Sequence, residues 1–201
     1  MQLHRTLIVG ALALGALSAE PLTQSERDKA MSHFHATRKV FLDSVAGLSD
    51  AQWNFKAAPE RWSIAECAEH IAVSEDAIFE FVRNALASPA EPEKKAMTRG
   101  KDDMVVKAMP DRSVKAQAPE FLQPKRRWPD RESLIAHFKD SRDRNIAYLQ
   151  TTEDDLRGHF VEHPVFKTLD AYQMMLLLSA HCERHTLQIN EVKADPNYPK
   201  N

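Results

Sequence analysis

The chain has 201 residues, of which 43% are hydrophobic and 28% are charged. This composition is typical of one globular domain with a single core, and it excludes a chain that is disordered throughout. The formal net charge of −2 gives no global attraction to nucleic acid, so we expect no nucleic-acid partner.

The N-terminus has the three-part layout of a secretory signal peptide. A short basic segment precedes an apolar run at residues 7–17, and small residues follow it. This run is too short to cross a bilayer comfortably. We therefore expect residues 1–19 to be removed and the domain, residues 20–201, to be exported to the periplasm or secreted, with no membrane span. An uncleaved N-terminal anchor is the alternative.

Two helices are predicted in the first half of the chain, and each begins with a capping box. The first has Thr23 as its N-cap and runs to about Val45. The second has Ser63 as its N-cap and runs to Leu86, before two prolines. Its apolar and small residues recur at spacings of three and four, which indicates a buried stripe. These residues are Ile64, Cys67, Ile71, Ser74, Ile78 and Val82.

The connector at residues 89–129 differs from its surroundings. It is rich in proline and charge, with a helical turn expected near 101–108, and its basic cluster at 125–128 is interpreted as solvated. Connectors of this length are unusual in a compact domain unless they cross from one end to the other.

Two further helices are predicted in the second half. One covers about 131–150, and the other starts at Thr168 or Asp170 and runs to about Lys193, with an irregular stretch between them. The fold class expected is therefore all-α: a four-helix bundle with a long crossover connection between helices 2 and 3.

His181 and His185 lie four residues apart on the inward stripe of the last predicted helix. Imidazoles at this spacing point to nearly the same side of a helix and could bind one metal ion. The alternative is a pair of buried polar residues. A second pair with the same spacing, His159 and His163, is interpreted as loop residues.

A third ligand has to come from another helix, and His70 lies near the buried stripe of the second one. Glu66 precedes it by one turn and could act as a general base or support a ligand, or could simply complete the capping box. Gln188, one turn after His185, could bond a ligand or water, or fill the core.

The segments "RWSIAECAEHI" and "HCERHTLQINEV" together resemble the DinB-like family of four-helix bundle proteins, and the resemblance covers about residues 27–195. It implies a divalent metal held by His70, His181 and His185, with water filling the open positions. The connector at 89–129 and the export segment depart from the family pattern.

Three neutral imidazoles with an open coordination position are typical of catalytic zinc sites, although nickel, iron and manganese also accept nitrogen ligands. We therefore expect a metal-dependent hydrolase or transferase acting on a small molecule. A non-catalytic metal- or ligand-binding module of the cell envelope is the alternative. A homodimer is a further expectation for a bundle of this kind.

The two cysteines, Cys67 and Cys182, each precede a candidate ligand by three residues. In an oxidising compartment they could form a disulfide. They could also join the metal site as ligands or serve as small buried hydrophobic residues.

Overall fold

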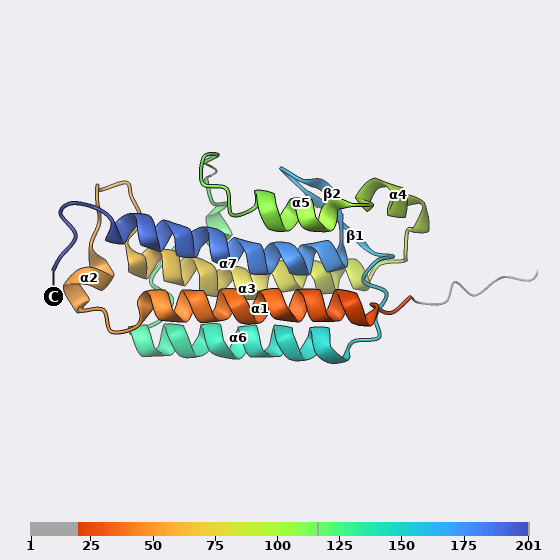
Figure 1. The fold of residues 1–201 in the computed structure, drawn as a ribbon, viewed down its shortest axis with the longest axis horizontal. Helices are drawn as coiled ribbons and strands as arrows, with labels where there is room; N and C mark the ends of the chain where they lie inside the picture. The colour runs from red at the N-terminus through yellow and green to blue at the C-terminus, as the bar shows by residue number, and fades with distance from the viewer. Residues whose placement is uncertain (1–19, 116, 201) are drawn as a thin grey trace, which may run out of the picture.

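The computed structural model describes residues 20–115 and 117–200, so the predicted signal peptide lies outside the described residues. Four long helices form a bundle, which confirms the predicted fold class (Figure 1). Within the described residues, no helix is long and apolar enough to cross a membrane. The four helices are α1 (Gln24–Val45), α3 (Ile64–Leu86), α6 (Arg131–Thr151) and α7 (Ala171–Lys193).

The helices begin where the sequence places capping residues. Thr23, Ser63 and Asp170 each accept a hydrogen bond from the backbone N–H three residues later, and each box is closed by a side chain that reaches back to the cap. Asp130 caps α6 through its carboxylate alone. These contacts satisfy N–H groups that the first turn of a helix leaves without a partner.

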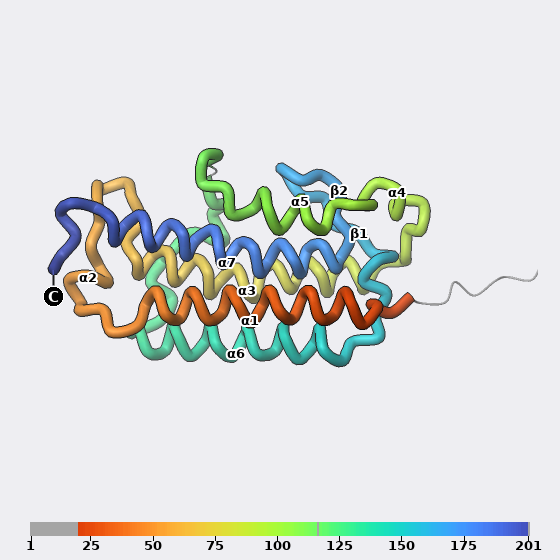
Figure 2. Tube along the Cα trace, in the orientation of Figure 1, coloured from red at the N-terminus to blue at the C-terminus, as the bar shows by residue number. Residues whose placement is uncertain are grey.

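The helices are arranged in a ring in the order α1, α7, α3, α6, because α7 and α6 each contact both α1 and α3. Helices α1 and α7 run in one direction and α3 and α6 in the other (Figure 2). Consecutive helices α3 and α6 are therefore parallel, and the chain between them must return along the whole bundle.

The connector makes that return and adds short elements to the bundle. These are the 3-10 turns η1 (Pro92–Lys94) and η2 (Glu120–Leu122) and the helices α4 (Lys95–Thr98) and α5 (Lys101–Ala108). Helix α5 matches the predicted turn and packs along α7 (Figure 1). Another short helix, α2 (Asp50–Asn54), lies between α1 and α3.

The stretch predicted to be irregular contains a small antiparallel hairpin, so that prediction was wrong for residues 160–170. Strands β1 (Phe160–His163) and β2 (Lys167–Asp170) pair with each other. The backbone N–H groups of Val165 and Phe166 donate to Nδ1 of His163 and close the turn. Strands this short show too little alternation to be predicted from sequence.

The core consists of two apolar clusters, one toward each end of the bundle. Between them lies a layer of buried polar side chains, one or two from each long helix, which we call the polar layer. It comprises Thr37, Glu75, Arg142, Asn145 and Ser179.

Candidate metal centre

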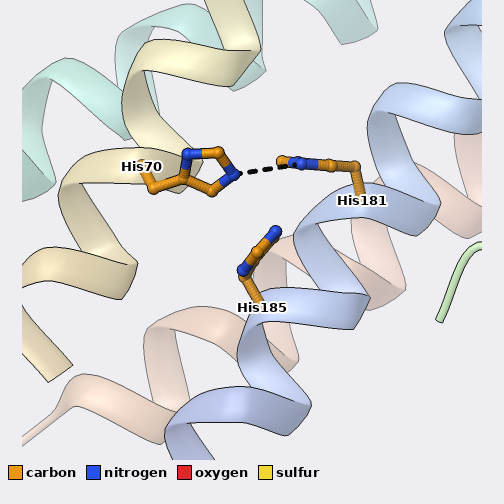
Figure 3. A group of neighbouring side chains, drawn as sticks. All are labelled: His70, His181 and His185. Atoms are coloured by element: carbon orange, nitrogen blue, oxygen red, sulfur yellow. Dashed lines mark hydrogen bonds between the residues drawn. The ribbon is translucent and has the colours of Figure 1, made fainter. Parts of the chain in front are cut away.

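Three histidines from two helices meet between α3 and α7. His70 points from α3 toward His181 and His185 on α7 (Figure 3). The Nε2 atoms of His70 and His181 are 3.2 Å apart. One ring nitrogen from each histidine lies within 4.8 Å of the others. The structure therefore brings together the three residues expected from the sequence.

All three rings are neutral at pH 7. Burial lowers the pKa of His70 to about 4. Burial also lowers the pKa values of His181 and His185 well below the ordinary value, and the neighbouring histidines lower them further. A neutral imidazole keeps one nitrogen lone pair, which is the form that binds a metal.

Hydrogen bonds set which nitrogen carries the proton in two of the rings. His70 donates from Nδ1 to the backbone carbonyl of Leu122 over 2.8 Å. His185 donates from Nδ1 to the side-chain oxygen of Gln188 over 2.9 Å. The proton is therefore on Nδ1 in both rings, and Nε2 is left with its lone pair. Gln188 thus bonds a candidate ligand, one of the two roles foreseen for it.

The cluster fits a divalent ion. Two nitrogens that each lie about 2.1 Å from one ion, at an angle of about 100°, are about 3.2 Å apart, which is the spacing of His70 and His181. A proton shared between those two nitrogens would satisfy them but not His185. His181 and His185 are both buried, and each residue keeps 8% of its surface exposed.

Trp62 borders the same cluster. Its ring centroid lies 4.9 Å from that of His70 and 6.0 Å from that of His185, and the side chain is half-buried. Its indole restricts the movement of both imidazoles and covers one side of the site with an apolar surface. The sequence placed Trp62 in the family motif without indicating this contact.

Glu66 has a structural role. Its carboxylate accepts from the backbone N–H of Ser63 in the capping box and pairs with Lys56 at 3.0 Å. In the part of the chain that the structure describes, it makes no hydrogen bond to the three histidines. The structure thus supports the capping role and gives no support to Glu66 as a general base.

Both cysteines are free thiols, so the disulfide that the sequence allowed is not formed in the structure. Cys67 and Cys182 lie in the same apolar cluster, and neither belongs to the group of candidate ligand atoms. Burial raises the pKa of Cys182 to about 12 and that of Cys67 even higher. The thiols stay protonated and pack as small hydrophobic residues.

The pair His159 and His163 lies at the hairpin rather than at a metal cluster. His159 precedes β1 and contacts the carbonyl of Ala85. Among residues 20–115 and 117–200, the three-histidine group is the one cluster whose ligand atoms converge closely enough for a metal.

A second cluster contains the residue types of a catalytic triad, namely Asp76, His137 and Ser141. Asp76 binds Nε2 of His137 at 2.6 Å, and the hydroxyl of Ser141 lies 3.5 Å from the same nitrogen. A triad needs the carboxylate and the hydroxyl on opposite ring nitrogens. This cluster is therefore a hydrogen-bonded contact between α3 and α6.

Comparison with known proteins relates most of the chain to a family and to a known fold. The chain is 24% identical over 163 residues to the uncharacterized protein YuaE of Bacillus subtilis (strain 168), covering 81% of this chain and 96% of YuaE. Its fold is similar to that of YfiT from Bacillus subtilis, with a TM-score of 0.57 and 16% identity, over 90% of this chain and 93% of YfiT. YfiT is described as a probable metal-dependent hydrolase with an unusual four-helix bundle topology. The model of the DinB superfamily matches residues 33–189, and the chain belongs to that superfamily.

Proposed function

We propose that the protein binds a divalent metal ion through His70, His181 and His185 and acts as a metal-dependent hydrolase or transferase on a small molecule. The observation that carries this proposal is the convergence of three neutral imidazoles with two Nε2 lone pairs already set by hydrogen bonds. The description of YfiT as a metal-dependent hydrolase supports the same class of reaction.

A divalent ion in such a site supplies Lewis-acid chemistry, since it polarises a substrate oxygen or sulfur and acidifies water. The chain itself contributes orientation and exclusion of solvent. Leu122 and Gln188 hold two rings in the ligating tautomer, and Trp62 covers one side. His181 and His185 each keep 8% of their surface exposed, which is the side from which a small substrate would approach.

The second candidate function is a non-catalytic metal- or ligand-binding module of the cell envelope. The contacts of Glu66 favour it, because the carboxylate that the sequence suggested as a general base is held by the capping box and by Lys56. Export to the periplasm, or secretion, belongs to both proposals and is supported by the layout of residues 1–19.

The metal content of the purified protein tests the proposal. We expect about one equivalent of zinc, nickel, iron or manganese, lost in His181→Ala. His35→Ala, an exposed histidine on α1, is the matched control and should keep the metal. Less than about 0.2 equivalents, unchanged by His181→Ala, would overturn metal binding. Bound metal without activity on ester, amide and thiol-conjugate panels would favour the binding module.

A further inference from the structure

The connector between α3 and α6 reaches the three-histidine cluster at two separate points. One is the carbonyl of Leu122, which accepts the Nδ1 proton of His70. The other is Arg112, which donates from Nη1 to the side-chain oxygen of Gln188 over 3.2 Å. That oxygen is also the acceptor for His185. The connector therefore contacts one ligand directly and another through a single amide.

Arg112 decides which way the amide of Gln188 faces. The oxygen receives protons from Arg112 and His185 together, so the amide cannot turn its NH2 group toward them without opposing two donors. Arg112 is itself held by Glu191, which accepts from Nε and Nη2 at 3.0 Å each. Without Arg112, the amide could rotate and donate to Nδ1 of His185. The ring proton would then move to Nε2, the atom needed for the metal.

Glu69 provides the equivalent anchor on the other side. Its buried carboxylate accepts from the backbone N–H groups of Lys125, Arg126 and Arg127 at 2.7–3.2 Å. Arg126 has a φ of 57°, and this left-handed residue turns successive N–H groups toward one anion.

Arg127 extends this anchor to the residues on either side of Leu122. Its guanidinium pairs with Glu69 at 2.9 Å and donates to the carbonyls of Phe121 and Gln123. The carbonyl of Leu122 between them is thereby held against His70.

We propose that two parts of the connector, Arg112 and residues 121–127, form the outer half of the metal centre, in which Arg112 and Glu69 are positioning residues that set the ring tautomers of His185 and His70. Neither residue belongs to the group of candidate ligand atoms. This inference rests on the proposed metal binding, but its first test does not require a metal.

The first test is nitrogen NMR of the histidine rings in the metal-free protein. We expect His70 and His185 to carry their protons on Nδ1. In Arg112→Met, His185 should show a substantial Nε2–H population while His70 stays unchanged, and Glu69→Gln should give the reverse. Arg131→Met is the matched control, because Arg131 also joins an acidic side chain, that of Asp50, to a backbone carbonyl, that of Leu48. Unchanged tautomers in both test variants would overturn the inference.

The second test is titration with Zn²⁺ against a competing chelator. Loss of a group that orients a ligand weakens metal binding by about tenfold or more, which we expect for Arg112→Met and Glu69→Gln. Gln188→Glu offers oxygen on both sides, so a rotated side chain still accepts from His185. In the Gln188→Glu background, Arg112→Met should therefore weaken Zn²⁺ binding by less than about twofold.

If Arg112 acted only by holding the connector, its loss would cost the same affinity in both backgrounds, and that outcome would overturn its orienting role. Failure of the native protein to bind any of Zn²⁺, Ni²⁺, Fe²⁺ and Mn²⁺ would instead overturn the proposed metal binding. The NMR result would still decide whether the connector sets the tautomers.

Discussion

The bundle buries two neighbouring groups of polar side chains, and they differ in how their polar atoms find partners. In the polar layer, the guanidinium of Arg142 pairs with Glu75 and donates to Thr37 at 2.9 Å, and Asn145 donates to Glu75 at 3.1 Å. Donors and acceptors therefore alternate, with only Nε of Arg142 unpaired. In the three-histidine cluster, Nε2 of His70 and Nε2 of His185 both carry lone pairs, and the ring of His181 can donate at most one proton to them through its Nε2.

This difference separates a structural group from a candidate metal site. Charges that are buried with their partners need no further ligand, although breaking such a pair is costly. Neutral imidazoles that converge with few donors among them gain most from a cation at their centre. Four predictions test this distinction, beginning with the largest expected effect.

Removal of Arg142 should destabilise the protein more than removal of any of the three histidines or of either cysteine. Arg142→Met leaves the buried carboxylate of Glu75 unpaired, and we expect the free energy of unfolding to fall by about 3–5 kcal/mol. Urea denaturation measures it. Adding Glu75→Gln removes the unpaired charge and should recover most of the loss. If Arg142→Met lowered the free energy of unfolding by less than about 1 kcal/mol, that result would contradict the pairing of Arg142 with Glu75 as a stabilising part of the polar layer.

Acid should weaken the metal-free protein through the histidine cluster. The folded pKa of His70, about 4, lies below its ordinary value of 6.5, so the unfolded chain binds more protons between these values. Stability is therefore complete above about pH 6.5 and is lost as the pH falls toward 4, by about 3 kcal/mol for this residue.

The measurement is the free energy of unfolding as a function of pH, with chelator present. His70→Phe should flatten the curve between pH 6.5 and 4, because it removes this protonation. Equal slopes in the native protein and in the variant would show that His70 does not have its lowered pKa.

A metal ligand should be dispensable for folding. His181→Leu removes a buried polar ring, so we expect the metal-free free energy of unfolding to change by less than about 1 kcal/mol or to rise. Zinc at a hundred times its dissociation constant should stabilise the native protein by about 2.7 kcal/mol and the variant hardly at all. Thermal unfolding with and without zinc measures both quantities. If His181→Leu greatly lowered the free energy of unfolding in the absence of metal, His181 would have a structural role like that of the polar layer.

The cysteines should give the smallest effects. Cys182 lies beside His181 in sequence, and its thiol faces the carbonyl of Thr37 in the polar layer at 3.9 Å. Because both thiols are buried and protonated, alkylation of the native protein should be far slower than that of the unfolded chain. Titration without reductant in denaturant should find two free thiols. A single disulfide would show that the two helices approach more closely at these residues than in the structure.

Much of the fold was predictable from local patterns. Capping residues and apolar spacings marked all four long helices to within a few residues, because capping and periodicity depend on neighbours in the chain. For the last helix, Thr168 and Asp170 were both possible starts, and the structure has Asp170 as the N-cap. The spacing of His181 and His185 belongs to the same class of signal. His70 was added by the resemblance to the DinB-like family and not by spacing alone.

The remaining features depended on contacts between distant segments. The pairing of Glu75 with Arg142 joins two helices through residues that are 67 positions apart, and neither residue carries a local mark of burial. The hydrogen bond from His70 to Leu122 uses a backbone carbonyl, a group that every residue carries. No residue type in the sequence therefore indicates where this bond forms.

By itself, the sequence determined the four helices, the need for a crossover and the histidines that could share an ion, because each follows from short-range geometry. The tertiary structure alone decided that the connector closes over those histidines, that Glu66 belongs to its cap and that the cysteines remain free thiols. The physical reason is that hydrogen-bond partners and burial are settled only when segments far apart in the chain pack together.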